Sequence, residues 1–343
     1  MKNIFTLVLL SLIVLSCSKT REKTFQFTSF EMDGISIRAI EAIDENTMWF
    51  AGSNGKVGYT ENAGESWFID SIRYDTLKPE FRSIAVTDSA VFVLSIASPA
   101  LLYKSTDKGQ NWKLVYKEDN PAAFYNAMTI SDSGFGVAVG DPIDDCLSVL
   151  ITTNGGNNWS KISCEVLPIT VNGEAGFAAS NSNVNIIDSH VWLVSGGTRA
   201  RVFHSENKGE TWKVYNTPIV QGGQMTGIFS SHFYDAEHGI IIGGDWNEKS
   251  KNTQNKAITS DGGRTWTLIS DGAGPSYRSS VRYLPGTDGQ ELVAVGIPGI
   301  SYSKDGGLNW TKLSDEAYYT IRFAKDGKSA WLAGSGKIAK MIW

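Results

Sequence analysis

Three carboxylates stand in polar stretches where they could act as catalytic groups. Asp141 lies in V-G-D-P, Glu174 in G-E-A-G-F-A-A-S and Asp245 in G-G-D-W-N-E. Two carboxylates about 5 to 10 Å apart can hydrolyse a glycosidic bond, one as the acid and the other as nucleophile or base. The chain therefore has candidate catalytic residues, provided that its fold brings two of them together.

Basic and amide side chains occur beside similar stretches and could bind the charged or hydroxyl groups of a ligand. The candidate binding residues are Arg38, Arg82, Asn126, Arg199 and Arg278. Arg201 is a weaker candidate because it borders the strand-like V-F-H-S and can point outwards. An open alternative is that these acids and bases pair with one another and so hold long loops in place, or that they simply face the solvent.

The composition argues against several other classes of protein. The four histidines are scattered, and no cluster of cysteine and histidine has the spacing of a metal site. The glycine fingerprint of a dinucleotide-binding helix is missing, so we expect neither a metal nor a cofactor. A formal net charge of −5 gives no support for nucleic-acid binding.

An eight-residue phrase recurs six times and indicates which elements must position these groups. Each copy has Ser or Thr first, Asp or Asn third, Gly fifth and Trp eighth, as in T-S-D-G-G-R-T-W ending at Trp266. The third side chain can accept bonds from backbone N–H groups across a tight turn, and the glycine supplies a positive φ. These third residues are Asn62, Asp107, Asn154, Asn207, Asp261 and Asp305. We expect structural hairpins here rather than an active site.

The phrase resembles the Asp-box, or BNR repeat, of sialidases, sortilin-like receptors and photosystem assembly factors. In those families it is a structural hairpin of a β-propeller, away from the working surface. The segments F-Y-N-A-M, G-I-F-S-S-H-F-Y-D and Y-R-S-S-V-R-Y-L-P-G are similar to exported bacterial propellers related to the YCF48-like photosystem II stability and assembly factors. This resemblance implies a fold more than a function, because such propellers serve as assembly factors, receptors and glycosidases.

The spacing of the repeats predicts how many blades the propeller has. The tryptophans of the six phrases lie about 49 residues apart, which suits a four-stranded blade. Seven units can be counted, and the seventh lacks an Asp-box, so a strand from Thr24 to Phe30 is expected to complete it and close the ring. The sequence therefore predicts an all-β fold, a single seven-bladed β-propeller of residues 24–343 with four-stranded antiparallel blades.

The same topology predicts where a ligand would bind. In a four-stranded blade the Asp-box turns lie on one face of the ring, and the loops between blades lie on the other. The long polar stretches fall on this second face, so we expect the candidate residues at the mouth of the central channel. Such a rim of mixed charge suits a polar ligand, either a glycan or a protein segment.

The N-terminus has the features of a targeting segment. Lys2 precedes an apolar run over residues 4–15 that is too short for an ordinary membrane span. V-L-S-C follows and resembles the bacterial lipobox, which implies a signal peptide of residues 1–16, lipidation of Cys17 and an anchor linker of residues 17–23. A plain secretory signal is the alternative.

Export has two further consequences. Ser18 after the lipobox cysteine favours the outer membrane of a Gram-negative-type cell envelope, with a periplasmic or an outward orientation left open. An oxidising compartment would also let Cys146 and Cys164, which flank the third Asp-box, form a disulfide. A strand shifted by one residue would instead point them to opposite faces, so the pairing stays open.

Two functional hypotheses remain. The first is a monomeric, lipid-anchored envelope propeller that binds its ligand at the polar rim without catalysis. The rival is a carbohydrate-active enzyme, a glycosidase or lyase that uses the rim carboxylates. Sialidases share an arginine triad and a tyrosine nucleophile, for which Tyr125, Tyr277 or Tyr319 could serve. The R-I-P motif that marks the first sialidase arginine is missing, which favours the binding module.

Overall fold

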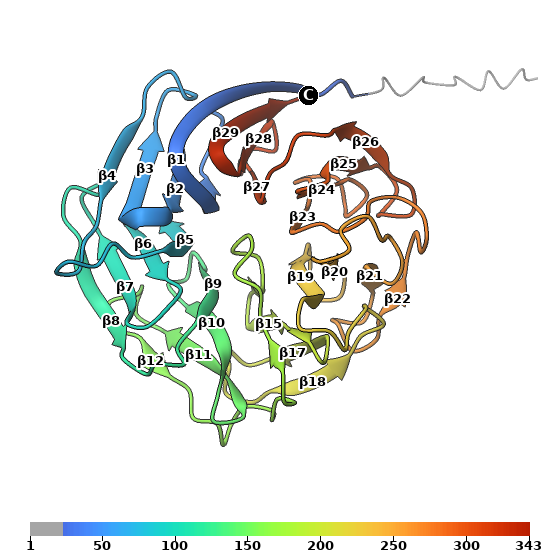
Figure 1. The fold of residues 1–343 in the computed structure, drawn as a ribbon, viewed down its shortest axis with the longest axis horizontal. Coiled ribbons are helices and arrows are strands. Elements are labelled where there is room, and N and C mark those ends of the chain that lie inside the picture. The colour runs from blue at the N-terminus through green and yellow to red at the C-terminus, as the bar shows by residue number, and fades with distance from the viewer. Residues whose placement is uncertain (1–22) are drawn as a thin grey trace, which may run out of the picture.

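Seven blades, each built on four main β-strands, stand around a central channel (Figure 1). The computed structural model describes residues 23–343, so the expected signal peptide and Cys17 lie outside the described residues. Within each blade, neighbouring strands run antiparallel and follow one another from the channel outwards. This architecture confirms the predicted all-β, seven-bladed fold.

The strands are assigned to blades as follows. Blade 1 contains the second half of β1 (Gln26–Ala42), then β2 (Met48–Gly52), β3 (Lys56–Thr60) and β4 (Phe68–Ser71); blade 2 contains β5 (Phe81–Thr87), β6 (Ala90–Ser95), β7 (Ala100–Ser105) and β8 (Lys113–Glu118). Blade 3 contains β9 (Tyr125–Ile130), β10 (Gly136–Ile143), β11 (Cys146–Thr152) and β12 (Ser160–Lys161); blade 4 contains β14 (Val184–Ile187), β15 (His190–Val194), β17 (Arg201–Ser205) and β18 (Lys213–Asn216). Blade 5 contains β19 (Thr226–Phe233), β20 (Gly239–Asp245), β21 (Lys256–Thr259) and β22 (Thr267–Leu268), extended at its inner edge by the short strands β16 (Gly196–Gly197) and β13 (Glu174–Ala175). Blade 6 contains β23 (Ser280–Tyr283), β24 (Leu292–Gly296), β25 (Gly299–Ser303) and β26 (Thr311–Ser314), and blade 7 contains β27 (Thr320–Phe323), β28 (Ser329–Ala333), β29 (Ser335–Ile342) and the first half of β1.

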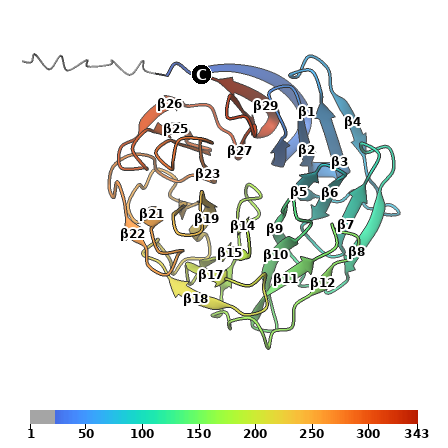
Figure 2. The ribbon, with the colours of Figure 1, turned by 180° about the vertical axis from the view of Figure 1, so that it is seen from behind.

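Strand β1 is shared by two blades and closes the ring. Its first half pairs antiparallel with β29, from Gln26 opposite Ile342 to Glu31 opposite Lys337, and its second half pairs with β2. Between the halves the register shifts around Gly34, whose φ of 73° favours glycine. The reverse view shows this ribbon beside β29 (Figure 2). The prediction that an N-terminal strand completes the last blade is confirmed, and it covers an edge of β29 that would otherwise be free to pair with other chains.

Hydrophobic side chains fill the spaces between neighbouring blades. The second strand of a blade has a neighbour on both faces, and accordingly every residue of β2, β6 and β24 is buried. Between blades 2 and 3, Phe92 and Leu94 of β6 share one cluster with Tyr125 and Met128 of β9. Each blade therefore needs both neighbours to bury its apolar surface, and the closed ring provides them.

The six Asp-boxes form the turns between the third and fourth strands of their blades. In blade 5, Asp261 Oδ1 accepts the N–H of Thr265 (2.9 Å) and the hydroxyl of Thr259 (2.8 Å). Thr259 Oγ1 accepts the N–H of Gly263 (2.9 Å), whose carbonyl accepts Nε1–H of Trp266 (2.9 Å). The bond from the Ser or Thr hydroxyl to the Asp or Asn occurs in all six boxes. The Ser or Thr hydroxyl and the Asp or Asn side chain of each box thus bond to each other within their own turn.

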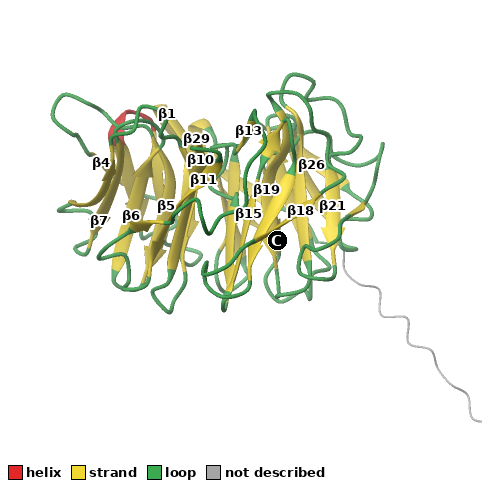
Figure 3. Ribbon diagram, turned by 90° about the horizontal axis from the view of Figure 1, so that it is seen from below, coloured by secondary structure: helices red, strands yellow, loops and turns green. Residues whose placement is uncertain are grey.

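The two faces of the ring carry different connections. The helix η1 (Ser53–Gly55) joins β2 to β3, opposite the Asp-box turn between β3 and β4, and in the edge-on view it lies at the same edge of the ring as β13 (Figure 3). This edge is the face of the loops between blades, called here the loop face. Within residues 23–343, no helix is long and apolar enough to cross a membrane.

A disulfide joins Cys146 to Cys164, the pair that the sequence left open. Cys146 is the first residue of β11 and is buried, whereas Cys164 follows β12 and is exposed. The bond therefore ties the long connection that leaves blade 3 to the turn between β10 and β11. The N–H of Thr170 donates to the carbonyl of Asp145 (2.8 Å) and continues this attachment along the loop face.

Candidate ligand-binding site

The connection between blades 3 and 4 ends in a loop that enters the central channel. Residues 174–183, called here the plug loop, project into the middle of the ring (Figure 1). Ser180 Oγ donates to the carbonyl of Ser279 (2.6 Å), at the inner edge of blade 6. On the other side, Asn181 Nδ2 donates to the carbonyl of Ile84 in blade 2 (2.8 Å). The plug loop therefore spans the channel and divides it into two parts.

On the loop face, the plug loop and the inner strands enclose a cavity of about 370 Å³, called here the mouth pocket. Its floor is aromatic, because Phe177 of the plug loop stacks on Phe229 of β19 with ring centroids 3.8 Å apart. Tyr277 packs edge-on against Phe229 (4.8 Å), and Trp246 packs edge-on against Tyr277 (5.5 Å). The channel mouth thus offers a packed apolar surface.

Arg38 and Arg82 line the mouth pocket beside that floor. Each donates from Nη1 to a plug-loop carbonyl, Arg38 to Ala179 (3.4 Å) and Arg82 to Ala178 (3.3 Å). Burial lowers the pKa of Arg38. Tyr319, whose ring centroid lies 3.9 Å from the guanidinium carbon, acts in the opposite direction on this pKa. Burial and then the charge of Arg38 lower the pKa of Arg82. Two guanidiniums near enough to repel each other therefore border the pocket, which favours an anionic or carbonyl group as their partner.

Asp141 is the one carboxylate among the described residues that line the mouth pocket. Its Oδ1 accepts Nδ2–H of Asn126 (2.9 Å) and the N–H of Gly176 in the plug loop (2.9 Å). Burial raises the pKa of Asp141, and these two hydrogen bonds oppose the shift. Asn126 is 1% exposed, so it can position Asp141 but cannot reach far into the pocket.

An Asp141→Asn variant is expected to gain stability relative to the wild type as the pH rises. Burial places the pKa of the folded carboxyl above its unfolded value of about 3.9, so the folded state binds the proton more tightly. The stability that the protonated group contributes is therefore lost as the pH rises through the folded pKa, whereas an amide loses nothing. Urea unfolding near pH 4 and near pH 7 measures this, and an equal difference between the two proteins at both values would contradict it.

Glu174, Asp245 and Arg199 lie outside the mouth pocket. Glu174 forms a buried ion pair with Arg201, whose Nη2 lies 2.5 Å from Glu174 Oε2. Asp245 ends β20, and its Oδ1 accepts the N–H of Asn247 (2.8 Å) in a turn. Arg199 is exposed in the connection between β16 and β17. Glu174 therefore forms a charge pair that holds a loop, as the alternative interpretation expected. Its partner Arg201 points inwards rather than outwards.

Asp141 and Glu174 both border a second hollow of about 420 Å³, next to the mouth pocket and lined also by Asp144 and Asp145. Both oxygens of Glu174 accept hydrogen bonds from Arg201. Within residues 23–343, no group of three or more histidine, cysteine, aspartate or glutamate side chains could hold a metal ion. The hollow is thus acidic, but one of its carboxylates is already neutralised.

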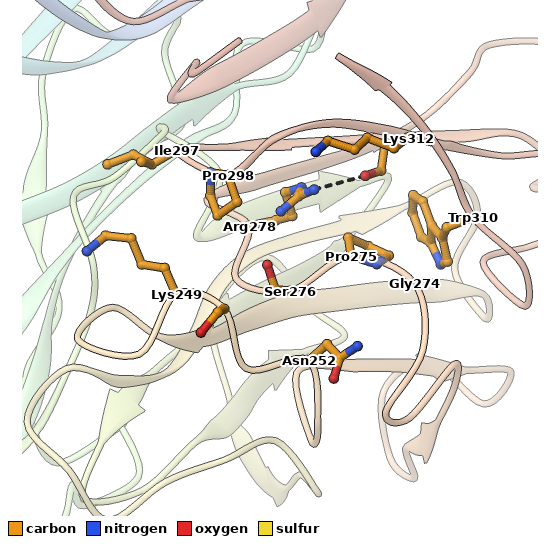
Figure 4. A pocket seen from close by; sticks show the side chains of 12 residues that line it. Lys249, Asn252, Gly274, Pro275, Ser276, Arg278, Ile297, Pro298, Trp310 and Lys312 are labelled. Carbon is orange, nitrogen blue, oxygen red and sulfur yellow. Dashed lines mark hydrogen bonds between the residues drawn. The ribbon is translucent and has the colours of Figure 1, made fainter. Parts of the chain in front are cut away.

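Arg278 lies in a separate groove between blades 5 and 6, with a volume of about 740 Å³ (Figure 4). Its guanidinium donates to Ser301 Oγ and to the carbonyl of Tyr277, both at 2.9 Å. Burial lowers the pKa of Arg278 to about 10. Lys249 and Lys312 line the same groove, and none of the described lining residues is a carboxylate. Arg278 therefore belongs to a basic groove and not to the mouth pocket.

The aromatic floor is the part of the site that the sequence did not predict. Phe177 and Trp246 do stand within predicted polar stretches, and Trp246 directly follows Asp245. An aromatic residue inside a polar loop is a signal of a contact surface, since one face of its ring must find a partner. Phe229 carries no such signal, because an apolar residue is expected on any inner strand.

The fold and the mouth pocket define the class of this protein: it is a seven-bladed Asp-box β-propeller with a ligand-sized pocket on the loop face. No protein family model matches the chain. The photosystem II assembly lipoprotein Ycf48 of Synechococcus sp. (strain CC9902) is 22% identical over 302 residues, and the match covers 77% of this chain and 85% of that protein. The chain is thus a Ycf48-like β-propeller, a distant homologue of that lipoprotein.

Solved structures with the same fold include two of YCF48. The structure of YCF48 bound to D1 peptide has a TM-score of 0.66 and 16% identity, covering 92% of this chain and 97% of that chain. YCF48 from Cyanidioschyzon merolae has a TM-score of 0.64 and 14% identity, with coverage of 92% and 98%. The WD40 β-propeller domain of Doa1 has a TM-score of 0.63 and 10% identity, covering 93% of this chain and 96% of that chain. At these identities the likeness establishes the fold.

Proposed function

We propose that this chain is a non-catalytic module that holds a segment of a partner protein in the mouth pocket. The main observation in support is that the mouth pocket combines an aromatic floor with the two guanidiniums of Arg38 and Arg82. An apolar side chain can pack on an aromatic floor, and guanidiniums donate hydrogen bonds to a carboxylate or a backbone carbonyl. YCF48, a related propeller, has been solved bound to D1 peptide, which supports a protein segment as the ligand.

The size and surroundings of the pocket favour an extended segment. A volume of about 370 Å³ holds a few side chains rather than a folded domain. On the side of blade 3 the pocket adjoins the acidic hollow, and on the side of blades 5 and 6 it adjoins the basic groove. Lys249 of that groove lies over Trp246 of the pocket (4.2 Å), so the two surfaces are continuous. A segment that carries both charges and an apolar residue would match this arrangement.

The rival function, a carbohydrate-active enzyme, requires two carboxylates at one substrate. Asp141 and Glu174 border the same hollow, which is the observation in its favour. Against it, Glu174 is bonded through both oxygens to Arg201. Asp245 lines neither the mouth pocket nor the hollow. The binding module is therefore the better supported of the two.

The double variant Arg38→Gln/Arg82→Gln is expected to weaken peptide binding at least tenfold. A charge-assisted hydrogen bond contributes about 1.5 to 3 kcal/mol, and about 1.4 kcal/mol corresponds to a factor of ten in affinity. An array of twelve-residue peptides would first identify sequences that bind the wild type. Fluorescence polarisation would then measure the affinity of these peptides for each protein in solution. Arg199→Gln, which changes an exposed arginine outside the pocket, is the matched control and should bind like the wild type.

Two outcomes of this experiment would contradict the proposal. Peptide affinity could stay unchanged in the double variant while its fold is intact by circular dichroism. Alternatively, a parallel panel of envelope glycans could be bound and cleaved, with cleavage lost in Asp141→Asn. The second result would favour the enzyme.

We also propose that the module is anchored in the cell envelope through a lipid on Cys17. The support is the V-L-S-C motif together with the homologue Ycf48, which is itself a lipoprotein. A Cys17→Ser variant should move from the membrane fraction to the soluble envelope fraction, as measured by fractionation and immunoblotting. Ser18→Ala keeps the cysteine and should stay with membranes. Membrane association of Cys17→Ser would argue against the anchor.

A further inference from the structure

A second cavity lies in the channel beyond the plug loop, towards the Asp-box turns. It has a volume of about 200 Å³ and is called here the inner cavity. Asn181 of the plug loop lines it at one end. Glu41, His232, Arg282 and Arg322 line it from the inner strands of blades 1, 5, 6 and 7. These charged and titratable groups have no part in the mouth pocket.

Arg322 is almost fully bonded within the protein. Its Nη1 donates to Thr320 Oγ1 (3.1 Å) and to the carbonyl of Ile321 (3.0 Å), and its Nη2 donates to the carbonyl of Asn181 (2.6 Å). Its Nε lies 3.6 Å from Glu41 Oε1. The carboxylate of Glu41 therefore neutralises Arg322, and this guanidinium also secures the plug loop.

Arg282, on the neighbouring blade, differs sharply from Arg322. Among residues 23–343 its guanidinium has no hydrogen-bond acceptor or carboxylate partner within contact distance, and its Nε is buried. Burial and then the charge of Arg322 lower the pKa of Arg282, and Glu41 opposes them. A guanidinium does not lose its proton in proteins, so a counter-charge beside this half-buried group is stabilising. Two guanidiniums share one carboxylate here, which leaves one positive charge facing the inner cavity.

His232 supplies a neutral donor to the same space. Its Nδ1 accepts the N–H of Tyr283 (3.0 Å), so the proton of the neutral ring is on Nε2. Burial lowers the pKa of His232 well below its usual value, and the charges of Arg282 and Arg322 act in the same direction. The ring therefore stays neutral, and its N–H can donate to an anion without adding charge.

We propose that the inner cavity binds one small monovalent anion, of the size of a halide or nitrate, with Arg282 as its main partner and His232 as a second donor. A cavity of about 200 Å³ holds such an ion and several waters, since a water occupies about 30 Å³. A dianion is disfavoured because Glu41 borders the same space. By neutralising Arg282 beside the closing blades 7 and 1, the ion would stabilise the ring. This inference does not depend on the proposed function.

Anomalous diffraction from crystals soaked in sodium bromide tests the site directly. A bromide peak is expected in the inner cavity within hydrogen-bonding distance of Arg282, and the peak should be absent in Arg282→Met. The absence of a peak in the wild type would overturn the proposal.

Thermal unfolding of the same proteins gives a test in solution. At constant ionic strength, replacing gluconate by bromide should raise the midpoint of the wild type relative to Arg282→Met, because only the folded wild type binds the ion. Effects of salt on protein surfaces in general are common to both proteins and cancel in the comparison. Glu41→Gln should enlarge the bromide effect by removing a competing charge, and Arg199→Gln should match the wild type. An equal response of Arg282→Met and the wild type would overturn the proposal.

Discussion

An Arg201→Met variant is expected to lose about 3 to 5 kcal/mol of unfolding free energy. Arg201 donates from Nε to Glu174 Oε1 (3.0 Å) and from Nη2 to Oε2 (2.5 Å), a two-point contact with a carboxylate whose side chain is 0% exposed. Without the guanidinium, the charge of Glu174 would stay buried with only a hydroxyl and a backbone N–H as partners. Leaving one buried charge alone costs more than the pair ever contributed.

The same substitution should disturb the mouth pocket. Glu174 begins the plug loop, and residues 175–179 of that loop form part of the pocket wall. A displaced Glu174 would therefore shift Phe177 on its stack with Phe229. We expect Arg201→Met to weaken peptide binding even though Arg201 does not line the pocket.

Urea unfolding followed by tryptophan fluorescence measures the loss of stability. Arg264→Met is the matched control, because its pair with Glu206 is about half exposed on both sides and water screens it. The double variant Arg201→Met/Glu174→Gln should recover part of the loss by removing the stranded charge. If Arg201→Met were as stable as Arg264→Met, the ion pair would not hold the plug loop as described.

Deleting residues 26–31 is expected to destabilise the ring by more than about 5 kcal/mol and to cause aggregation. The deletion removes the strand that pairs with β29, and with it Phe27 and Phe30. Phe30 packs against Trp67 of blade 1 and Trp331 of blade 7, with ring centroids 5.8 and 6.0 Å away. Truncating one fully buried phenylalanine typically costs about 3 to 5 kcal/mol. Phe27 and Phe30 are partly buried, so each contributes part of that amount, and the loss of a whole paired strand adds to it.

A synthetic peptide of residues 24–32 provides the decisive control. Added to the deletion variant, it should take the place of the missing strand, raise the thermal midpoint and keep the protein monomeric in size-exclusion chromatography. The same peptide with Phe30→Ala should rescue less, because Trp67 and Trp331 lose their common partner. A deletion variant that stays monomeric with an unchanged midpoint would show that the strand does not close the ring.

Part of the candidate site could be predicted from blade topology alone. Arg38 and Arg82 stand near the start of the inner strand of their blades, and Asp141 lies near the end of β10. In an antiparallel blade these positions fall on one face, so the mouth pocket brings the three together. Arg278 also lies just before an inner strand, β23. Its side chain nevertheless lies in the groove between blades 5 and 6, where Ser301 of β25 accepts its hydrogen bond.

Other parts depended on partners that no local pattern reveals. Glu174 stands in a polar loop, where the sequence suggests a catalytic role, but Arg201 in β17 of blade 4 neutralises it. Trp246 and Phe177 come from connections of different blades and meet through Phe229 and Tyr277. Such contacts follow from the shape of the packed ring, which the order of residues does not display.

The sequence by itself determined the repeat, the seven blades, the closing strand and the face on which loops gather. These features follow from hydrogen bonds within each Asp-box and from alternating apolar residues in short strands, both of which act over a few residues. Only the tertiary structure decided that a loop plugs the channel, that aromatic rings floor its mouth and that Arg282 faces the inner cavity with a buried Nε that has no partner among residues 23–343. The physical reason is that burial and charge pairing join residues from different blades, and their energies depend on distances set only when the ring has closed.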